Sequence, residues 1–236
     1  MDSFEHFCPE HIGTLIIIAI AITVGLLLLK KRSDKTVQAV ARVLSVIVLL
    51  GELLQDILLI RDGGNLIGFL PLHLCNLGIF VNLAASFSRG KVQSFFAEIS
   101  VVLILPGAVG ALVFPDWTYR PFWSYLPLLC FFTHALLVFI PVLFLAKKKA
   151  NISFRHFWYS YLFLLMVTPP IYLLDKQTGV NYMFLLYPPK DTPLEWINSI
   201  TGDSFYIAGL LILVTVILAI EYLIYTSINA IRNYGK

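Results

Sequence analysis

Seven long apolar segments, separated by short polar stretches, dominate the pattern of the chain. Their predicted ranges are Ile12–Leu29, Ala39–Ile60, Leu66–Phe87, Phe95–Phe114, Phe122–Ala146, Ile152–Leu174 and Phe205–Ile228. Each is about 20 residues long, which is the length an α-helix needs to cross a bilayer. Backbone groups in lipid must pair within their own segment, so runs of this length indicate helices and not barrel strands. The predicted fold is an all-α membrane bundle of seven transmembrane helices, forming a single domain over residues 1–236.

The composition excludes an ordinary water-soluble protein. Hydrophobic residues make up 58% of the 236 residues and charged residues only 13%, whereas a soluble chain is about one quarter charged. The seven segments leave too few residues for a separate soluble domain. In such a chain the formal charge of +3 reflects orientation in the membrane, so no nucleic-acid partner is expected.

The basic residues are distributed unevenly between the two predicted sides. Thirteen of the 17 Lys and Arg residues fall on one side of the bundle. The other side has four, which are Arg61, Arg120, Lys176 and Lys190. Because cytoplasmic loops carry the excess of Lys and Arg, this predicts the N-terminus outside and the C-terminus in the cytoplasm. The expected location is a bacterial plasma membrane.

The second segment contains a stripe of polar side chains. Gln55 and Asp56 lie three and four residues after Glu52, so the three side chains share one helix face. This face must point into the bundle. One interpretation is interhelical hydrogen bonding that fixes the packing. The other is a carboxylate beside a reactive centre or an aqueous cavity.

The third segment contains LPLHLCNLGIF and is expected to be helical below a proline kink. On a regular helix Pro71, Cys75, Gly78 and Asn82 fall within about 60° of one another and form a small, polar face. His73 lies about 160° from Cys75 on the same wheel. His73 is therefore not expected to act as the base for Cys75 unless the helix is locally broken.

The fifth segment offers a base in His134, which shares a face with Cys130. The third and fifth segments run in the same direction, and the depths of Cys75 and His134 differ by only several ångströms, at about 1.5 Å per residue. A thiol beside an imidazole is the arrangement used in nucleophilic catalysis. Two alternatives stay open: Cys75 as a small apolar residue with His134 as a structural hydrogen-bond partner, and Cys130 as the nucleophile.

Other chemistry is not indicated by the sequence. The three cysteines, Cys8, Cys75 and Cys130, are far apart and do not suggest a disulfide framework. The five histidines are scattered and show no spacing typical of metal ligands. We therefore expect no metal and no cofactor.

Five motifs spread over nearly the whole chain carry a family resemblance. They are FEHFCPEH at Phe4–His11, LPLHLC at Leu70–Cys75, LPGAVGALVFPDW at Leu105–Trp117, FFTHALLVFIP at Phe131–Pro141 and GVNYMFLLYPP at Gly179–Pro189. They resemble the YwaF-type integral membrane family, which includes eukaryotic cysteine-dependent acyltransferases acting on lyso-ether phospholipids. The resemblance implies a Cys–His pair within the membrane, and the matching positions here are Cys75 and His134.

The resemblance implies acyl transfer from a phospholipid donor to a lysophospholipid acceptor through a thioester on Cys75. His134 would be the base, and Glu52 or Asp56 would orient it. Oxyanion donors are expected among Asn76, His73 and Asn181. The full set of supporting or substrate-binding candidates is His73, Asn76, Glu52, Asp56, Asn82, Asn181 and Tyr182.

Two other functions remain compatible with the sequence. A transporter or channel would use the stripe of Glu52, Gln55 and Asp56, together with Asn82, as a path for a small solute or proton. A scaffold or lipid-binding subunit would need neither the stripe nor Cys75 beyond stability. Substitution of Cys75 and of Glu52 distinguishes the three hypotheses.

Overall fold

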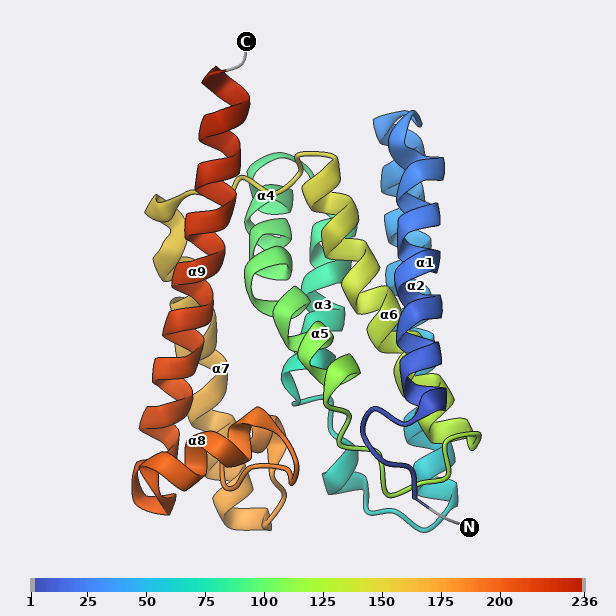
Figure 1. The fold of residues 1–236 in the computed structure, drawn as a ribbon, viewed down its shortest axis with the longest axis vertical. Coiled ribbons are helices and arrows are strands. Elements are labelled where there is room, and N and C mark those ends of the chain that lie inside the picture. Colours follow the sequence, from blue (N-terminus) through green and yellow to red (C-terminus); the bar gives the residue numbers. More distant parts are fainter. Residues whose placement is uncertain (1–2, 235–236) are drawn as a thin grey trace. The chain divides into compact units, whose positions relative to one another are not determined.

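The computed structural model describes residues 3–234 and the side chains of residues 3–227, and the described chain is helical (Figure 1). Its α-helices are α1 (Pro9–Lys30), α2 (Asp34–Arg61), α3 (Leu74–Phe87), α4 (Gly90–Ile99), α5 (Leu105–Val113), α6 (Tyr125–Ala146), α7 (Phe157–Thr178), α8 (Pro193–Thr201) and α9 (Tyr206–Tyr234). No strand occurs among the described residues. The all-α prediction is confirmed.

The chain forms two compact units, residues 1–150 and 151–236. In the first unit α6 packs against α1, α2, α3 and α5. In the second unit α7 and α8 each pack against α9. The predicted outer connection, residues 175–204, thus contains a short helix, α8, and a 3₁₀ turn at Tyr182–Phe184.

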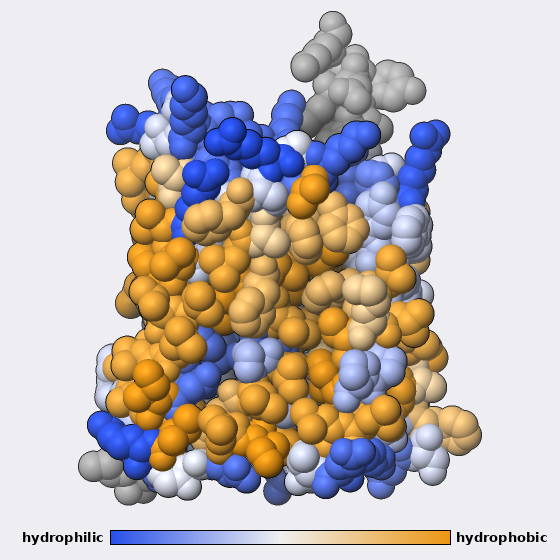
Figure 2. All heavy atoms as spheres, turned by 180° about the vertical axis from the view of Figure 1, so that it is seen from behind, coloured by the Kyte–Doolittle hydropathy of each residue, from blue (hydrophilic) through white to orange (hydrophobic). Residues whose placement is uncertain are grey.

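Six helical stretches within the described residues are long and apolar enough to cross a membrane. They are Pro9–Lys30, Asp34–Arg61, Gly90–Val113, Tyr125–Ala146, Phe154–Thr178 and Asp203–Ser227. Apolar side chains such as Ile17 and Leu28, each 67% exposed, face outward, and apolar residues cover most of the face seen in Figure 2. In a protein that displays this much apolar surface, the solvent for these helices is lipid.

The third predicted segment differs from the continuous helix expected from its hydropathy. Leu66–Phe69 forms a 3₁₀ turn, the chain is then extended, and α3 begins only at Leu74. Pro71 explains the break, because it lacks an N–H donor and biases the preceding Leu70 toward the extended conformation that it adopts. With 14 residues α3 is about 21 Å long, shorter than the roughly 30 Å hydrocarbon core.

The fourth segment contains a widened turn. α4 continues through a π-helical stretch, Ser100–Ile104, into α5, so that Gly90–Val113 is one long helix (Figure 1). Pro106 lies two residues after this stretch and cannot donate the usual hydrogen bond, and its ring would crowd the carbonyl four residues earlier. The π-helical side chains are buried, and Ile104 contacts α3 at Gly78.

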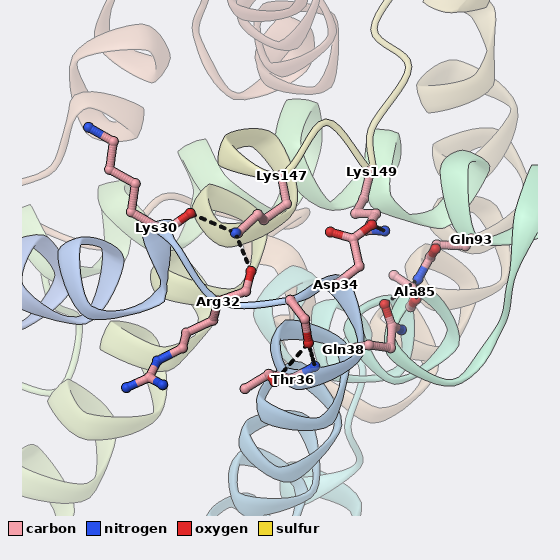
Figure 3. A network of polar contacts seen from close by, with 10 residues as sticks. Lys30, Arg32, Asp34, Thr36, Gln38, Ala85, Gln93, Lys147 and Lys149 are labelled. Carbon is pink, nitrogen blue, oxygen red and sulfur yellow. Dashed lines mark hydrogen bonds and ion pairs between the residues drawn. The ribbon is translucent and has the colours of Figure 1, made fainter.

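One end of the first unit is held together by polar contacts between distant segments (Figure 3). Lys147, just after α6, donates hydrogen bonds to the carbonyls of Lys30 and Arg32, each at 3.0 Å. Gln93 of α4 donates to Gln38 Oε1 of α2 at 2.8 Å. The ends of α1 and α6 and the beginnings of α2 and α4 therefore lie together, as the alternating direction of the predicted segments requires.

The opposite end is fixed by contacts around Asp62 and the loop between α5 and α6. The Tyr125 hydroxyl donates to Asp62 Oδ2 at 2.7 Å, which joins the end of α2 to the beginning of α6. The same hydroxyl and the Arg61 guanidinium hold the pKa of the Asp62 carboxyl below its usual value. These contacts close the end of the unit from which α3 begins.

We expect Gly78→Ala to lower the free energy of unfolding by about 1–3 kcal/mol. A Cβ at this position would overlap Ile104 Cγ2, and the fully buried Ile104 has no room to move. Gly110→Ala is the matched control, because a Cβ there meets no atom within 4 Å and alanine favours a helix by up to about 1 kcal/mol. Thermal unfolding in detergent measures both. Equal stability of the two variants would contradict the close approach of α3 and the π-helical turn.

Candidate functional site

Cys75 lies in the first turn of α3, directly after the break in the third segment. His73 is the N-cap residue of the helix, and Cys75 is half-buried. The N–H groups of a first turn have no intrahelical acceptors, and the helix dipole favours negative charge at this end. The break therefore places Cys75 beside backbone N–H groups that have no helical acceptor.

The break also changes the interpretation of His73. The helical-wheel argument, which placed His73 on the opposite face from Cys75, does not apply because His73 precedes the helix. Its ring instead lies close enough to His134 for the two to interact electrostatically. The segment before α3 and the middle of α6 therefore meet around two imidazoles.

The polar stripe of α2 faces the interior, as predicted. The Asn76 side-chain amide of α3 donates a hydrogen bond to Glu52 Oε1, and Cys130 Sγ of α6 donates to Gln55 Oε1 at 3.2 Å. Asp56 interacts electrostatically with Glu52. The neighbouring Leu53 is 48% exposed, which shows that the apolar face of α2 points the other way. The stripe thus joins α2 to both α3 and α6.

The ring of His134 is oriented by the backbone of its own helix. Its Nδ1 lies 2.8 Å from the carbonyl oxygen of Cys130, and a carbonyl only accepts, so Nδ1 carries the proton. The neutral ring then has a lone pair on Nε2, which is the form required of a base. The indole of Trp117 packs against the imidazole, with ring centroids 5.0 Å apart. The expectation that Glu52 or Asp56 orients His134 is not met at Nδ1, where the Cys130 carbonyl takes that role.

Asp116, in the loop after α5, was missed by the sequence reasoning. It interacts electrostatically with both Cys75 and Cys130. Its side chain is reached by solvent, yet the protein atoms packed around it raise the pKa of the Asp116 carboxyl above its usual value. An acidic residue two positions after the predicted end of the fourth segment was the available signal.

The first unit thus brings together a thiol, two imidazoles and three carboxylates. Cys75 interacts electrostatically with Glu52 as well as with Asp116, and with Cys130 one turn from His134. No hydrogen bond joins Cys75 Sγ to His134 or to any other described residue. Cys75 is half-buried, whereas the Cys130 thiol is buried and donates a hydrogen bond to Gln55.

Asn82 belongs to a different polar cluster. It lies seven residues after Cys75, about 10 Å farther along α3. Its Oδ1 accepts a hydrogen bond from Ser100 Oγ at 2.5 Å, and the hydroxyls of Ser45 and Ser86 lie 2.9 Å apart beside it. Asn82, Ser45, Ser86 and Ser100 are all buried. Their geometry is that of an interhelical hydrogen-bond cluster.

Asn181 and Tyr182 belong to the second unit. The Asn181 amide donates to the Tyr187 carbonyl at 2.7 Å, and its Oδ1 accepts from the Leu186 backbone N–H at 2.8 Å. Tyr182 is fully buried within the connection between α7 and α8. Both residues stabilise this connection, and their assignment to the site remains a prediction.

The N-terminal motif FEHFCPEH packs onto the loop that carries Asp116. The Phe7 N–H donates to His11 Nδ1 at 3.0 Å, and His11 Nε2 donates to the Leu112 carbonyl at 2.8 Å. The His11 ring contacts Phe131, whose ring in turn contacts Trp117, each pair with centroids 5.5 Å apart. Through Trp117 this segment supports the ring of His134.

Six apolar helical stretches define a multi-pass helical membrane protein, and its first unit contains a cluster of polar side chains between helices. The chain belongs to the TMEM164 family, because the model of that family matches residues 6–222. The match includes every site residue named above. Neither the curated proteins nor the solved structures with which the chain was compared give a match. The YwaF-type label and the relation to acyltransferases stay predictions.

Proposed function

We propose that the protein is a membrane phospholipid acyltransferase that carries the acyl group as a thioester on Cys75. The observation that supports this most strongly is a half-buried, unbonded thiol at the N-terminus of α3, inside a cluster that includes His134. A thiol in this position combines first-turn backbone donors with an apolar surrounding, and the proposal adds the His134 imidazole as its base, which suits attack on a lipid ester.

In the first half-reaction, His134 Nε2 takes the proton of the Cys75 thiol. The thiolate attacks the ester carbonyl of the donor phospholipid, the C–S bond forms and the ester C–O bond breaks. The leaving lysophospholipid oxygen takes the proton back from His134. The carboxylates of Glu52 and Asp116 disfavour negative charge on sulfur, so in this proposal the thiolate forms only together with the His134 imidazolium.

In the second half-reaction, His134 deprotonates the hydroxyl of a lysophospholipid acceptor. This oxygen attacks the thioester, a new ester C–O bond forms, the C–S bond breaks and Cys75 recovers its proton. The backbone N–H groups of Cys75 and Asn76 are the oxyanion donors of this proposal, since first-turn N–H groups have no intrahelical acceptor. The Asn76 side-chain amide already donates a hydrogen bond to Glu52. In this proposal the side chain therefore positions α3 against α2 and does not bind the oxyanion.

The proposal keeps the predicted membrane arrangement of seven crossings, with the N-terminus outside and the C-terminus cytoplasmic, in a bacterial plasma membrane. The third crossing would consist of the extended segment before α3 together with α3 itself. Substrates would enter laterally from lipid, with the headgroup near the loop that carries Asp116 and the acyl chains in the hydrocarbon region.

The test is an acyl-transfer assay with the purified protein in phospholipid vesicles. Vesicles would contain a phospholipid with an isotope-labelled acyl chain, and a lysophospholipid would be added as acceptor. We expect labelled acceptor product, detected by mass spectrometry, and release of free fatty acid would identify a hydrolase instead. Two results together would favour the transporter: no labelled product forms with any headgroup tested, and the vesicles show a solute flux that depends on Glu52 and not on Cys75.

A further inference from the structure

Basic side chains from two distant segments meet at the end of the first unit opposite Cys75. Lys147 donates hydrogen bonds to the carbonyls of Lys30 and Arg32, and Lys149 Nζ lies 2.7 Å from Asp34 Oδ2 (Figure 3). We call the cations of these two segments the basic junction. It consists of Lys30, Lys31, Arg32, Lys35, Lys147, Lys148 and Lys149.

The basic junction has far more positive than negative charge. Asp34 is the one carboxylate within these two segments, and Lys149 is its ion-pair partner. Lys31, Arg32, Lys35 and Lys148 are exposed, and no acidic residue that the structure describes forms an ion pair with them. Hydrogen bonds of Lys147 and Lys149 join the two segments, so their cations lie close to one another. An anion from outside the chain would relieve the repulsion among these cations.

The position of the basic junction identifies the class of anion. α1 ends at Lys30, α2 begins at Asp34 and α6 ends at Ala146, so the cations lie where three membrane helices leave the hydrocarbon region. Phosphate headgroups occupy this level. Below it, α1 presents exposed Leu27 and Leu28 and a shallow groove lined by Ala19, Ile20, Thr23 and Val24. A molecule with a phosphate head and acyl tails matches both features.

We propose that the basic junction is a binding site for an anionic phospholipid of the adjacent leaflet. Lysine ammonium groups contact the phosphate, and the acyl chains lie along α1. The basic junction is separate from the reactive centre. Cys75 lies at the beginning of α3, whereas the other end of this helix, where Gln93 donates to the Ala85 carbonyl, is about 18 Å farther along. The proposal is therefore independent of the acyltransferase proposal.

The test measures binding of phosphatidylglycerol and of phosphatidylcholine to the full chain in neutral detergent, by native mass spectrometry. We expect the wild type to retain phosphatidylglycerol in preference to phosphatidylcholine. Replacing Lys31, Arg32, Lys35 and Lys148 together by Gln should weaken phosphatidylglycerol binding by at least about tenfold. The variant with Arg at the three lysine positions keeps the charge and should bind as the wild type does.

Two controls separate this site from general attraction. Arg89→Gln with Lys91→Gln removes exposed cations of the α3–α4 turn and should leave binding unchanged. Inorganic phosphate at the same concentration should not displace the lipid, because it lacks the acyl chains. Four results would each overturn the proposal. The wild type could retain the two lipids equally, or the Gln variant could bind phosphatidylglycerol as the wild type does. The Arg89 and Lys91 variant could lose binding as strongly as the Gln variant, or free phosphate could displace the lipid.

Discussion

Cys75→Ala should abolish acyl transfer, lowering kcat by about 10³-fold or more while the protein stays folded. Loss of an attacking nucleophile removes the covalent route altogether, so effects of this size or larger are typical. The substitution removes one half-buried sulfur that makes no hydrogen bond to a described residue, and we expect a stability change of about 1 kcal/mol or less. Labelled product from reconstituted vesicles and the melting temperature in detergent measure the two effects separately.

Cys130→Ala is the matched control for Cys75→Ala. Its thiol is buried and donates to Gln55, so its loss should lower stability and leave most of the transfer rate. A rate that survives in Cys75→Ala and disappears in folded Cys130→Ala would assign the nucleophile to Cys130 and overturn the proposed mechanism.

His134→Asn should lower kcat by about 10² to 10⁴-fold, the range expected when a general base is removed. An asparagine amide retains a donor for the Cys130 carbonyl, so the local helix contact is kept while the basic nitrogen is lost. The smaller His134→Ala leaves space beside Trp117, and imidazole added to the buffer should restore part of its activity.

Chemical rescue distinguishes a base from a packing residue. Imidazole should increase the rate of His134→Ala and should have no effect on Cys75→Ala, which lacks the nucleophile. If His134→Asn transfers acyl groups at the wild-type rate, His134 is a structural residue, and His73, which interacts with it across the site, becomes the next candidate.

The helical architecture follows from the sequence because lipid imposes a simple rule. Runs of about 20 apolar residues must form helices, and ionisable groups such as Glu52 must face other helices. These constraints are local along the chain, so the hydropathy pattern identified the long helices and the inward direction of the α2 stripe. The similar depth of Cys75 and His134 stays a prediction.

The departures from the predicted pattern arise where proline and packing override hydropathy. Pro71 ends the helix that hydropathy extends to Leu66, and this break moves Cys75 to a helix N-terminus and His73 outside the helix. Hydropathy also does not show which side chain of the fourth segment approaches α3, so the hydrogen bond from Ser100 to Asn82 was not foreseeable. Asp116 lies in a loop, where no periodicity indicates which way a side chain points.

The most direct test of the central claim is to trap the acyl group on the protein. Purified wild-type protein would be mixed with a phospholipid carrying a labelled acyl chain, without acceptor, and analysed by intact and peptide mass spectrometry. The mechanism predicts one acyl adduct on Cys75, cleaved by neutral hydroxylamine and discharged when lysophospholipid is added. Acyl transfer that proceeds with no adduct on Cys75, or with an adduct on another residue, would contradict it.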